Sequence, residues 1–160
     1  MELWEIEARE SIRDLVARYN ANGDSGRFEQ VLAVFAPDAV MELVSGDGSV
    51  TRFEGVDQIA TIFTSTKDRW DATVAPAVAK GTGRSGARHH IRHFVATHQI
   101  DVDGPNHARG RSYFCVLMAH GLDHWGRYVD EYEQRDGRWL ISRRRALTDG
   151  HAAGGSLTTE

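Results

Sequence analysis

Three residues of this chain are of types that can transfer a proton or stabilise a developing charge: Tyr19, Asp24 and His93. A histidine exchanges protons near neutral pH, and a carboxylate beside it orients the ring and stabilises its charged form. A tyrosine hydroxyl could donate a hydrogen bond to a developing enolate. Each residue also has a structural interpretation: His93 as a hydrogen-bonded core histidine, Asp24 as an N-cap of a second helix, and Tyr19 as a core aromatic.

The eight histidines of the chain include three in the segment 87–94, which raises the hypothesis of a metal site. In a strand, at ~3.3 Å per residue, His89 and His93 lie ~13 Å apart and His90 points to the opposite face, so the three cannot share one ion. Only a helix would bring His89 and His93 together. We therefore expect no metal, and His89 and His90 stay open as alternatives to His93 as the base.

The sequence also lacks the signals of other cofactor and nucleophile chemistries. It has no Gly-x-Ser-x-Gly motif for a nucleophilic serine and no glycine-rich loop between a strand and a helix for phosphate. Cys115 is the one cysteine and is expected to be a buried small apolar residue. We expect no cofactor.

The length and net charge of the chain limit the classes of protein to which it can belong. The chain of 160 residues fits one domain, expected over 1–148. Its 19 Lys and Arg against 23 Asp and Glu give a net charge of −4 without a basic stripe, so we expect no nucleic-acid partner. No apolar run is long enough for a membrane span, and the N-terminus does not resemble a signal peptide, so we expect a cytoplasmic protein.

Helical periodicity dominates the first part of the chain. Apolar residues at positions 12, 15, 16 and 19 predict an amphipathic helix over 3–19. A second helix is predicted over 28–35, ended by Pro37, and a third over 56–63. Strands are predicted over 40–43 and 51–54, and the segment 71–88 is expected to be a long loop.

Strand signals dominate the second part. Segments 91–102, 109–119, 125–135 and 138–148 are separated by turn residues and predict an antiparallel meander, followed by a flexible tail over 149–160. Alternation places His93, Val95 and Thr97 on one face, and Arg144 on the face of Leu140 and Ser142. The expected class is therefore α+β, with N-terminal helices packed on a strongly curved antiparallel sheet that leaves a concave pocket.

Five segments carry a family resemblance. Together they are similar to the SnoaL-like domain of the nuclear-transport-factor-two-like superfamily, over about residues 3–150, which implies a cone-shaped barrel. The segments are Arg92-His-Phe-Val-Ala-Thr97, Ile100-Asp-Val-Asp-Gly104, Ala108-Arg-Gly-Arg-Ser-Tyr-Phe114, Gly126-Arg-Tyr-Val-Asp130 and Asp136-Gly-Arg-Trp-Leu-Ile-Ser-Arg-Arg-Arg145.

Within this family the sequence is most similar to the branch of scytalone dehydratase and bile-acid 7α-dehydratase. That branch uses a tyrosine and an aspartate at the end of the first helix and a histidine on the first strand of the large sheet. The resemblance implies that Tyr19, Asp24 and His93 are catalytic. Many relatives keep an arginine five residues after the tryptophan of the last strand, which makes Arg144 a candidate for substrate binding. Tyr113 and Tyr128 are further candidates for lining the pocket.

Two functions follow from these residues. The first is a cofactor-independent dehydratase or isomerase that abstracts a proton from a small hydrophobic carbonyl compound, such as a polyketide, a steroid or an aromatic metabolite. The alternative is a non-catalytic module of the same fold for ligand binding or assembly. Because one sheet face needs a cover, we also expect a homodimer or homotrimer.

Overall fold

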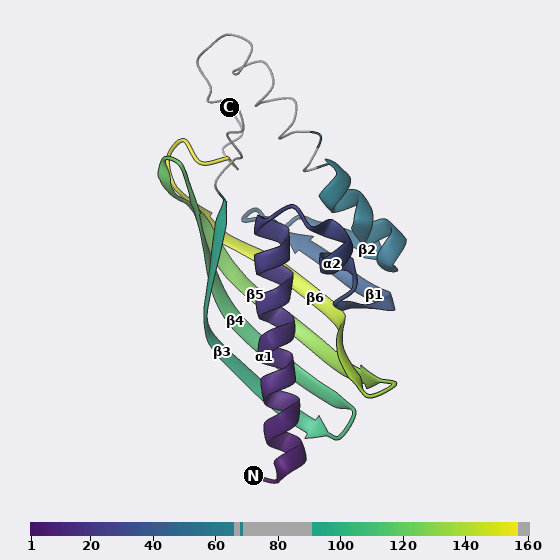
Figure 1. The fold of residues 1–160 in the computed structure, drawn as a ribbon. Coiled ribbons are helices and arrows are strands. Elements are labelled where there is room, and N and C mark those ends of the chain that lie inside the picture. The colour runs from purple at the N-terminus through teal and green to yellow at the C-terminus, as the bar shows by residue number, and fades with distance from the viewer. Residues whose placement is uncertain (66–67, 69–90, 157–160) are drawn as a thin grey trace.

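The computed structural model describes residues 1–65, 68 and 91–156. A long helix, α1 (Leu3–Asp24), lies across a curved sheet, and a short helix, α2 (Phe28–Leu32), follows it (Figure 1). A further helix covers residues 56–65, as the apolar spacing predicts. The strands of the sheet are β1 (Phe35–Val44), β2 (Val50–Glu54), β3 (Arg92–Gly104), β4 (His107–Met118), β5 (Gly121–Arg135) and β6 (Arg138–His151).

The sheet is open and mixed, with the order β2-β1-β6-β5-β4-β3. The meander from β3 to β6 is antiparallel, as predicted, but β1 runs parallel to β6. The predicted fold of N-terminal helices packed on a curved sheet is confirmed, and the sheet differs from the expectation in being mixed, because β1 runs parallel to β6. Local periodicity predicts which segments are strands, whereas the direction of a pairing between the first and the last strand depends on the path of the whole chain.

Helix α1 covers the concave face of the sheet and supplies much of the core (Figure 1). Its buried apolar side chains recur three and four residues apart, so they form one stripe on the helix. Fully burying a side chain of the size of isoleucine contributes about 1.5–3 kcal/mol. The stripe consists of Ala8, Ile12, Leu15 and Val16, and it belongs to the same core cluster as Ile59 and Ile141.

Two helix boundaries differ from the prediction. Helix α1 continues past Tyr19 to Asp24, through a segment rich in turn-forming residues, and Asn20 inside it donates a hydrogen bond to the Val16 carbonyl at 2.9 Å. Helix α2 ends at Leu32, and Phe35 already belongs to β1. Pro37 is exposed within β1, at the point where the pairing with β6 is interrupted, so its missing N–H is tolerated there.

The C-terminal segment is attached to the sheet further than expected. Strand β6 extends to His151, and the backbone and hydroxyl of Ser156 donate hydrogen bonds to the Asp123 carboxylate at 2.8 and 2.7 Å. Asp123 is fully buried and also contacts the rings of His120 and His124. The predicted tail over 149–160 therefore begins after the strand and is held at Ser156.

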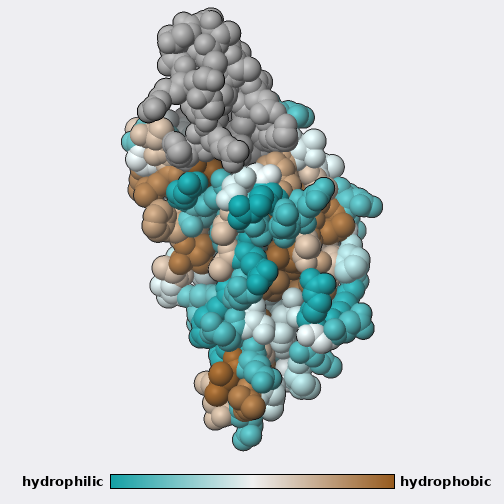
Figure 2. All heavy atoms as spheres, viewed as in Figure 1, coloured by the Kyte–Doolittle hydropathy of each residue, from teal (hydrophilic) through white to brown (hydrophobic). Residues whose placement is uncertain are grey.

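Several predictions fall on residues outside the described part of the chain. They are the loop over 71–88 and the side chains of His89 and His90. Among the described residues, no helix is long and apolar enough to cross a membrane. On the side of the molecule that α1 covers, the surface is mainly hydrophilic (Figure 2).

Replacing Asp123 by Asn is expected to lower the free energy of unfolding by about 2 kcal/mol at pH 7, because the charge-assisted bonds from His124 and Ser156 are lost. Burial alone would raise the pKa of Asp123, but the hydrogen bonds of His124 and Ser156 hold it below its usual value. A lowered pKa stabilises the fold above about pH 4, and this stabilisation is lost as the pH falls through the folded-state pKa.

The stability difference between wild type and Asp123→Asn should therefore shrink below about pH 4 in urea unfolding measured across pH. The matched control is Asp136→Asn, at an exposed turn position. A difference that stays constant at all pH values would contradict the assigned role of the carboxylate.

Candidate functional site

The end of helix α1 and the start of strand β3 bring Asp24 and His93 together. The Asp24 Oδ1 atom lies 2.6 Å from His93 Nδ1, and Oδ2 accepts the His93 backbone N–H at 2.9 Å. The Asp24 side chain is 9% exposed and that of His93 is 24% exposed. An ionised carboxylate can only accept, so Nδ1 carries the proton of the neutral ring and Nε2 is its proton-accepting nitrogen.

This contact decides between the two interpretations of Asp24. The N-cap residue of α2 is Arg27, so Asp24 does not cap that helix. Both carboxylate oxygens of Asp24 are instead used to fix the backbone and the ring of His93. The arrangement suits a histidine whose second nitrogen exchanges a proton with a ligand.

A small cavity of about 140 Å³ adjoins the pair. A water molecule occupies ~30 Å³ of liquid, so the cavity has the volume of a ring-sized group. Apart from Asp24, His93 and the Asn20 amide, its walls are mainly apolar, and they belong to α1, α2, the helix over 56–65 and the start of β3. Its lining residues are Tyr19, Asn20, Gly23, Asp24, Phe28, Ile62, Phe63, Ile91 and His93.

Behind Tyr19 lies a buried arginine. The Arg144 guanidinium carbon is 4.1 Å from the centre of the Tyr19 ring and 4.2 Å from that of Tyr128, so the cation is stacked between two aromatic faces. Arg144 is 0% exposed and binds the Asp130 carboxylate through Nε at 2.9 Å and Nη2 at 2.7 Å. Its Nη1 atom is buried without a hydrogen-bond partner.

Burial and the arginine act in opposite directions on the tyrosines. Burial raises the pKa of the Tyr19 hydroxyl, and Arg144 offsets part of this rise. Burial also raises the pKa of Tyr128. Burial would lower the pKa of Arg144, but Asp130 outweighs this effect and the pKa is raised. At neutral pH the site therefore holds a permanent cation between two protonated phenols.

The predicted face of Arg144 is wrong because strand β6 contains an irregularity. Pairing with β5 shifts between Ile141 and Arg143, so Ser142 is the extra residue and the alternation reverses after it. Arg144 therefore shares the buried face of Ile141. Its neighbours Arg143 and Arg145 face the other way and form ion pairs with Glu42 at 3.1 and 2.9 Å.

Two other predictions are corrected by the geometry of the strands. Tyr113 is 59% exposed on the outer face of β4, opposite the buried Ser112 and Phe114, so it does not line the cavity. Thr97 does not share the face of His93, because an irregularity between Ala96 and Gln99 turns it outward. Tyr128 is buried beside Tyr19, as a candidate for the site should be, but it is not part of the cavity wall described above.

Sequence reasoning missed two residues of the buried network, His98 and Tyr132. The Tyr132 hydroxyl donates a hydrogen bond to Asp130 at 2.8 Å and lies 3.3 Å from His98 Nε2. The alternation Tyr128-x-Asp130-x-Tyr132 was a usable signal for Tyr132, because it places polar atoms on one strand face. No local signal marks His98, whose orientation depends on the irregularity at Thr97.

A second space lies between α1 and the edge strand β3. This groove of about 520 Å³ shares Asn20, Asp24 and His93 with the small cavity. The histidine and aspartate are thus accessible from two sides. The other residues that line the groove are Arg13, Val16, Ala17, Ala21, Ser25, Arg92, Val95 and His98.

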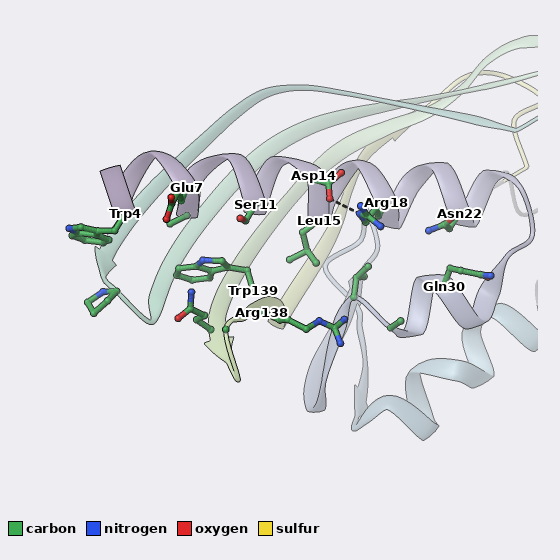
Figure 3. Close-up of a pocket in the computed structure, with 16 residues that line it drawn as sticks. Trp4, Glu7, Ser11, Asp14, Leu15, Arg18, Asn22, Gln30, Arg138 and Trp139 are labelled. Carbon is green, nitrogen blue, oxygen red and sulfur yellow. Dashed lines mark hydrogen bonds and ion pairs between the residues drawn. The ribbon is translucent and has the colours of Figure 1, made fainter. Parts of the chain in front are cut away.

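A larger groove of about 880 Å³ runs along α1 away from this pair. Figure 3 shows Trp4, Ser11 and Leu15 on the helix above Trp139, with Asp14 paired to Arg18. The groove contains no histidine, and its charged residues are exposed to solvent. Within residues 1–65, 68 and 91–156, no group of three or more His, Cys, Asp or Glu side chains could hold a metal ion. The acid-base pair therefore marks the candidate site.

Comparison with protein families identifies the fold. Residues 4–145 match the model of the SnoaL-like domain. The chain belongs to the SnoaL-like domain family. Among curated proteins, no sequence matches this chain.

Solved structures similar to this SnoaL-like domain share its NTF2-like fold at low sequence identity. One is the hexachlorocyclohexane dehydrochlorinase LinA-type3 from Novosphingobium barchaimii. It has a TM-score of 0.70 and 17% identity, with 100% of both chains covered. A candidate scytalone dehydratase from Novosphingobium aromaticivorans has a TM-score of 0.67 and 19% identity, with the same coverage. A candidate β subunit of an aromatic-ring-hydroxylating dioxygenase from that organism has a TM-score of 0.71 and 17% identity over 99% of both chains. Such identities establish the fold alone.

Replacing Arg144 by Met in this SnoaL-like domain is expected to cost about 3–5 kcal/mol of stability, because it leaves the Asp130 carboxylate buried and unpaired. The double variant Arg144→Met with Asp130→Leu should recover at least about half of the loss, since an apolar pair can replace a buried ion pair. Urea unfolding of the wild type, of the single variants Arg144→Met and Asp130→Leu, and of the double variant measures these values. A double variant as unstable as the sum of its single variants would contradict this account.

Proposed function

We propose that this SnoaL-like domain is a cofactor-independent lyase or isomerase that acts by proton abstraction on a small hydrophobic carbonyl compound. The observation that carries the proposal is the 2.6 Å contact between Asp24 and His93 at the polar end of an otherwise apolar cavity. An apolar cavity with a few convergent polar groups is the usual form of a small-molecule site. The dehydratase and dehydrochlorinase names among proteins of the same fold are consistent with elimination chemistry.

In the proposed reaction, Nε2 of His93 removes a proton from the carbon next to the substrate carbonyl. The electron pair of that C–H bond moves toward the carbonyl oxygen, and an enolate forms. Asp24 stabilises the imidazolium through the Nδ1 hydrogen bond, and the Tyr19 hydroxyl donates a hydrogen bond to the enolate oxygen. In a dehydratase, a β-hydroxyl then leaves as water with the proton returned by His93. In an isomerase, the proton returns to another carbon.

Tyr19 is suited to this role by its position. Its ring is a wall of the cavity, and its other side is stacked on the Arg144 cation. Burial raises the pKa of Tyr19 and the Arg144 cation offsets part of that rise, so the hydroxyl is a stronger hydrogen-bond donor than an equally buried phenol without the cation. Arg144 itself is fully buried, so we assign it to the support of Tyr19 in place of the direct substrate contact expected from the sequence.

Replacing His93 by Gln is expected to reduce turnover of a hydroxylated ketone by at least about 10²-fold, because glutamine cannot accept the proton. Asp24→Asn should reduce it by a smaller factor, because the ring loses the partner that stabilises its charge. Loss of water from a panel of β-hydroxyketones with one ring measures the effect, with His107→Gln, at an exposed histidine of β4, as the matched control.

Two results would reject the catalytic proposal. One is turnover by His93→Gln equal to that of the wild type. The other is a wild type that binds ring-sized ketones in the cavity but does not exchange the proton on the carbon next to the carbonyl. NMR in deuterated water measures this exchange. The second result would favour the non-catalytic binding module.

We also propose that the domain forms a homodimer or homotrimer through the outer face of its sheet. Phe94, Cys115 and Trp125 lie side by side across β3, β4 and β5, and Tyr113 lies in the next row. Phe94 is 56% exposed and Tyr113 59% exposed. Adjacent large apolar side chains on one face are typical of an interaction surface.

The double variant Phe94→Lys with Tyr113→Lys is expected to convert the oligomer to a monomer, because charges would face each other across the interface. Light scattering coupled to size-exclusion chromatography measures the mass. Leu3→Lys, on the exposed start of α1, is the matched control. A wild type that is monomeric at high concentration would contradict the proposal.

A further inference from the structure

Strand β3 contains a strained irregularity that turns His98 toward the interior. Thr97 adopts a φ of 52°, in the left-handed region, which is strained for a β-branched residue. At this point the pairing with β4 skips between Ala96 and Gln99. Regular alternation from His93 would leave position 98 outside, whereas the irregularity places His98 among the partly buried residues next to Ile100.

The neighbouring strand leaves space for this histidine. A Cβ atom at Gly110 of β4 would lie 2.8 Å from Tyr132 Cε2, 2.9 Å from the Tyr132 hydroxyl oxygen and 3.3 Å from His98 Nε2. The two distances to Tyr132 are shorter than the contacts that real Cβ atoms make, so a side chain at position 110 would displace Tyr132 from its contact with His98. Two unrelated local features, the strained Thr97 and the missing side chain at 110, thus serve the same contact.

The hydrogen bonds define where the protons lie in a series of contacts that begins at His98. The Tyr132 hydroxyl has one proton, and it is donated to the Asp130 carboxylate at 2.8 Å. The Tyr132 hydroxyl oxygen also lies 3.3 Å from His98 Nε2, and in this contact the oxygen accepts a hydrogen bond from Nε2. Asp130 in turn holds Arg144 through two hydrogen bonds, and Arg144 lies against the ring of Tyr19. His98 is thereby connected to a wall of the cavity.

We propose that His98 is a positioning residue of the site: through Tyr132 and Asp130 it fixes the Arg144 guanidinium behind Tyr19 and so maintains Tyr19 as a hydrogen-bond donor. The inference rests on the role of Tyr19 in the proposed function. Burial lowers the pKa of His98, which keeps the ring neutral at pH 7 and leaves Arg144 as the cation of the network. The Nδ1 atom carries no proton, and His98 lines the groove between α1 and β3.

The test uses 4-nitrophenol as a probe, because its phenolate resembles an enolate and absorbs visible light. A site that donates a strong hydrogen bond to the phenolate lowers the pKa of the bound probe. We expect the wild type to lower it, and His98→Leu and Tyr132→Phe each to reverse the effect by about one pKa unit, a tenfold change in the ionised fraction. His98→Gln should retain the wild-type value, since its amide nitrogen can replace the Nε2 donor.

Double variants distinguish one connected series of hydrogen bonds from separate structural effects of the two residues. His98→Leu combined with Tyr132→Phe should be no worse than either single variant, because each breaks the same connection. In a Tyr19→Phe background, His98→Leu should have no further effect. His107→Leu, which removes an exposed histidine of β4, is the matched control. The Nε2–H tautomer of His98, and its loss in Tyr132→Phe, are read from nitrogen NMR of the histidine rings.

Three results would overturn the inference: no change of the probe pKa in His98→Leu, additive effects of the two single variants, or no binding of the probe by the wild type. None of these measurements requires turnover. If β-hydroxyketones are not dehydrated while the probe responds to His98 as expected, the proposed reaction is rejected and the positioning role of His98 is retained.

Discussion

The buried ion pair of Arg144 and Asp130 is the constraint on which the interior of this domain depends. A guanidinium that is 0% exposed requires compensation from its surroundings, and three groups provide it: the Asp130 carboxylate and the faces of Tyr19 and Tyr128. Because α1 carries Tyr19, β5 carries Tyr128 and Asp130, and β6 carries Arg144, the pair fixes the position of the helix relative to the sheet. The same helix ends in Asp24, and its position determines whether Asp24 reaches His93.

A buried charged network of this kind adds little to the free energy of unfolding. An apolar cluster of similar volume would be as stable as a buried ion pair or more stable, and it would need neither the irregularity at Ser142 nor the strained Thr97. Retention of charges and strain in a core is typical of functional sites, where electrostatic preorganisation matters more than stability. The network also lies directly behind Tyr19, one of the cavity walls.

The sequence predicted those features that depend on local periodicity. The amphipathic spacing in α1 and the alternation in β3 to β6 indicated the helix-on-sheet class, and Tyr19, Asp24 and His93 could be selected by residue type together with family resemblance. The parallel pairing of β1 with β6 could not be predicted, because the alternation of apolar and polar residues in a strand is the same for parallel and antiparallel pairing. The faces of Arg144 and His98 could not be predicted either, since one extra residue in a strand reverses the orientation of all that follow.

These irregularities also bear on how function varies within one fold. Proteins with 17–19% identity share this fold, so its curvature and topology tolerate replacement of about four-fifths of the side chains. In this chain, one irregularity brings Arg144 inside and another brings His98 inside, and hydrogen bonds connect the two through Tyr132 and Asp130. The two irregularities thus decide which polar side chains the interior of this chain holds, because regular alternation would leave Arg144 and His98 on the opposite face of the sheet.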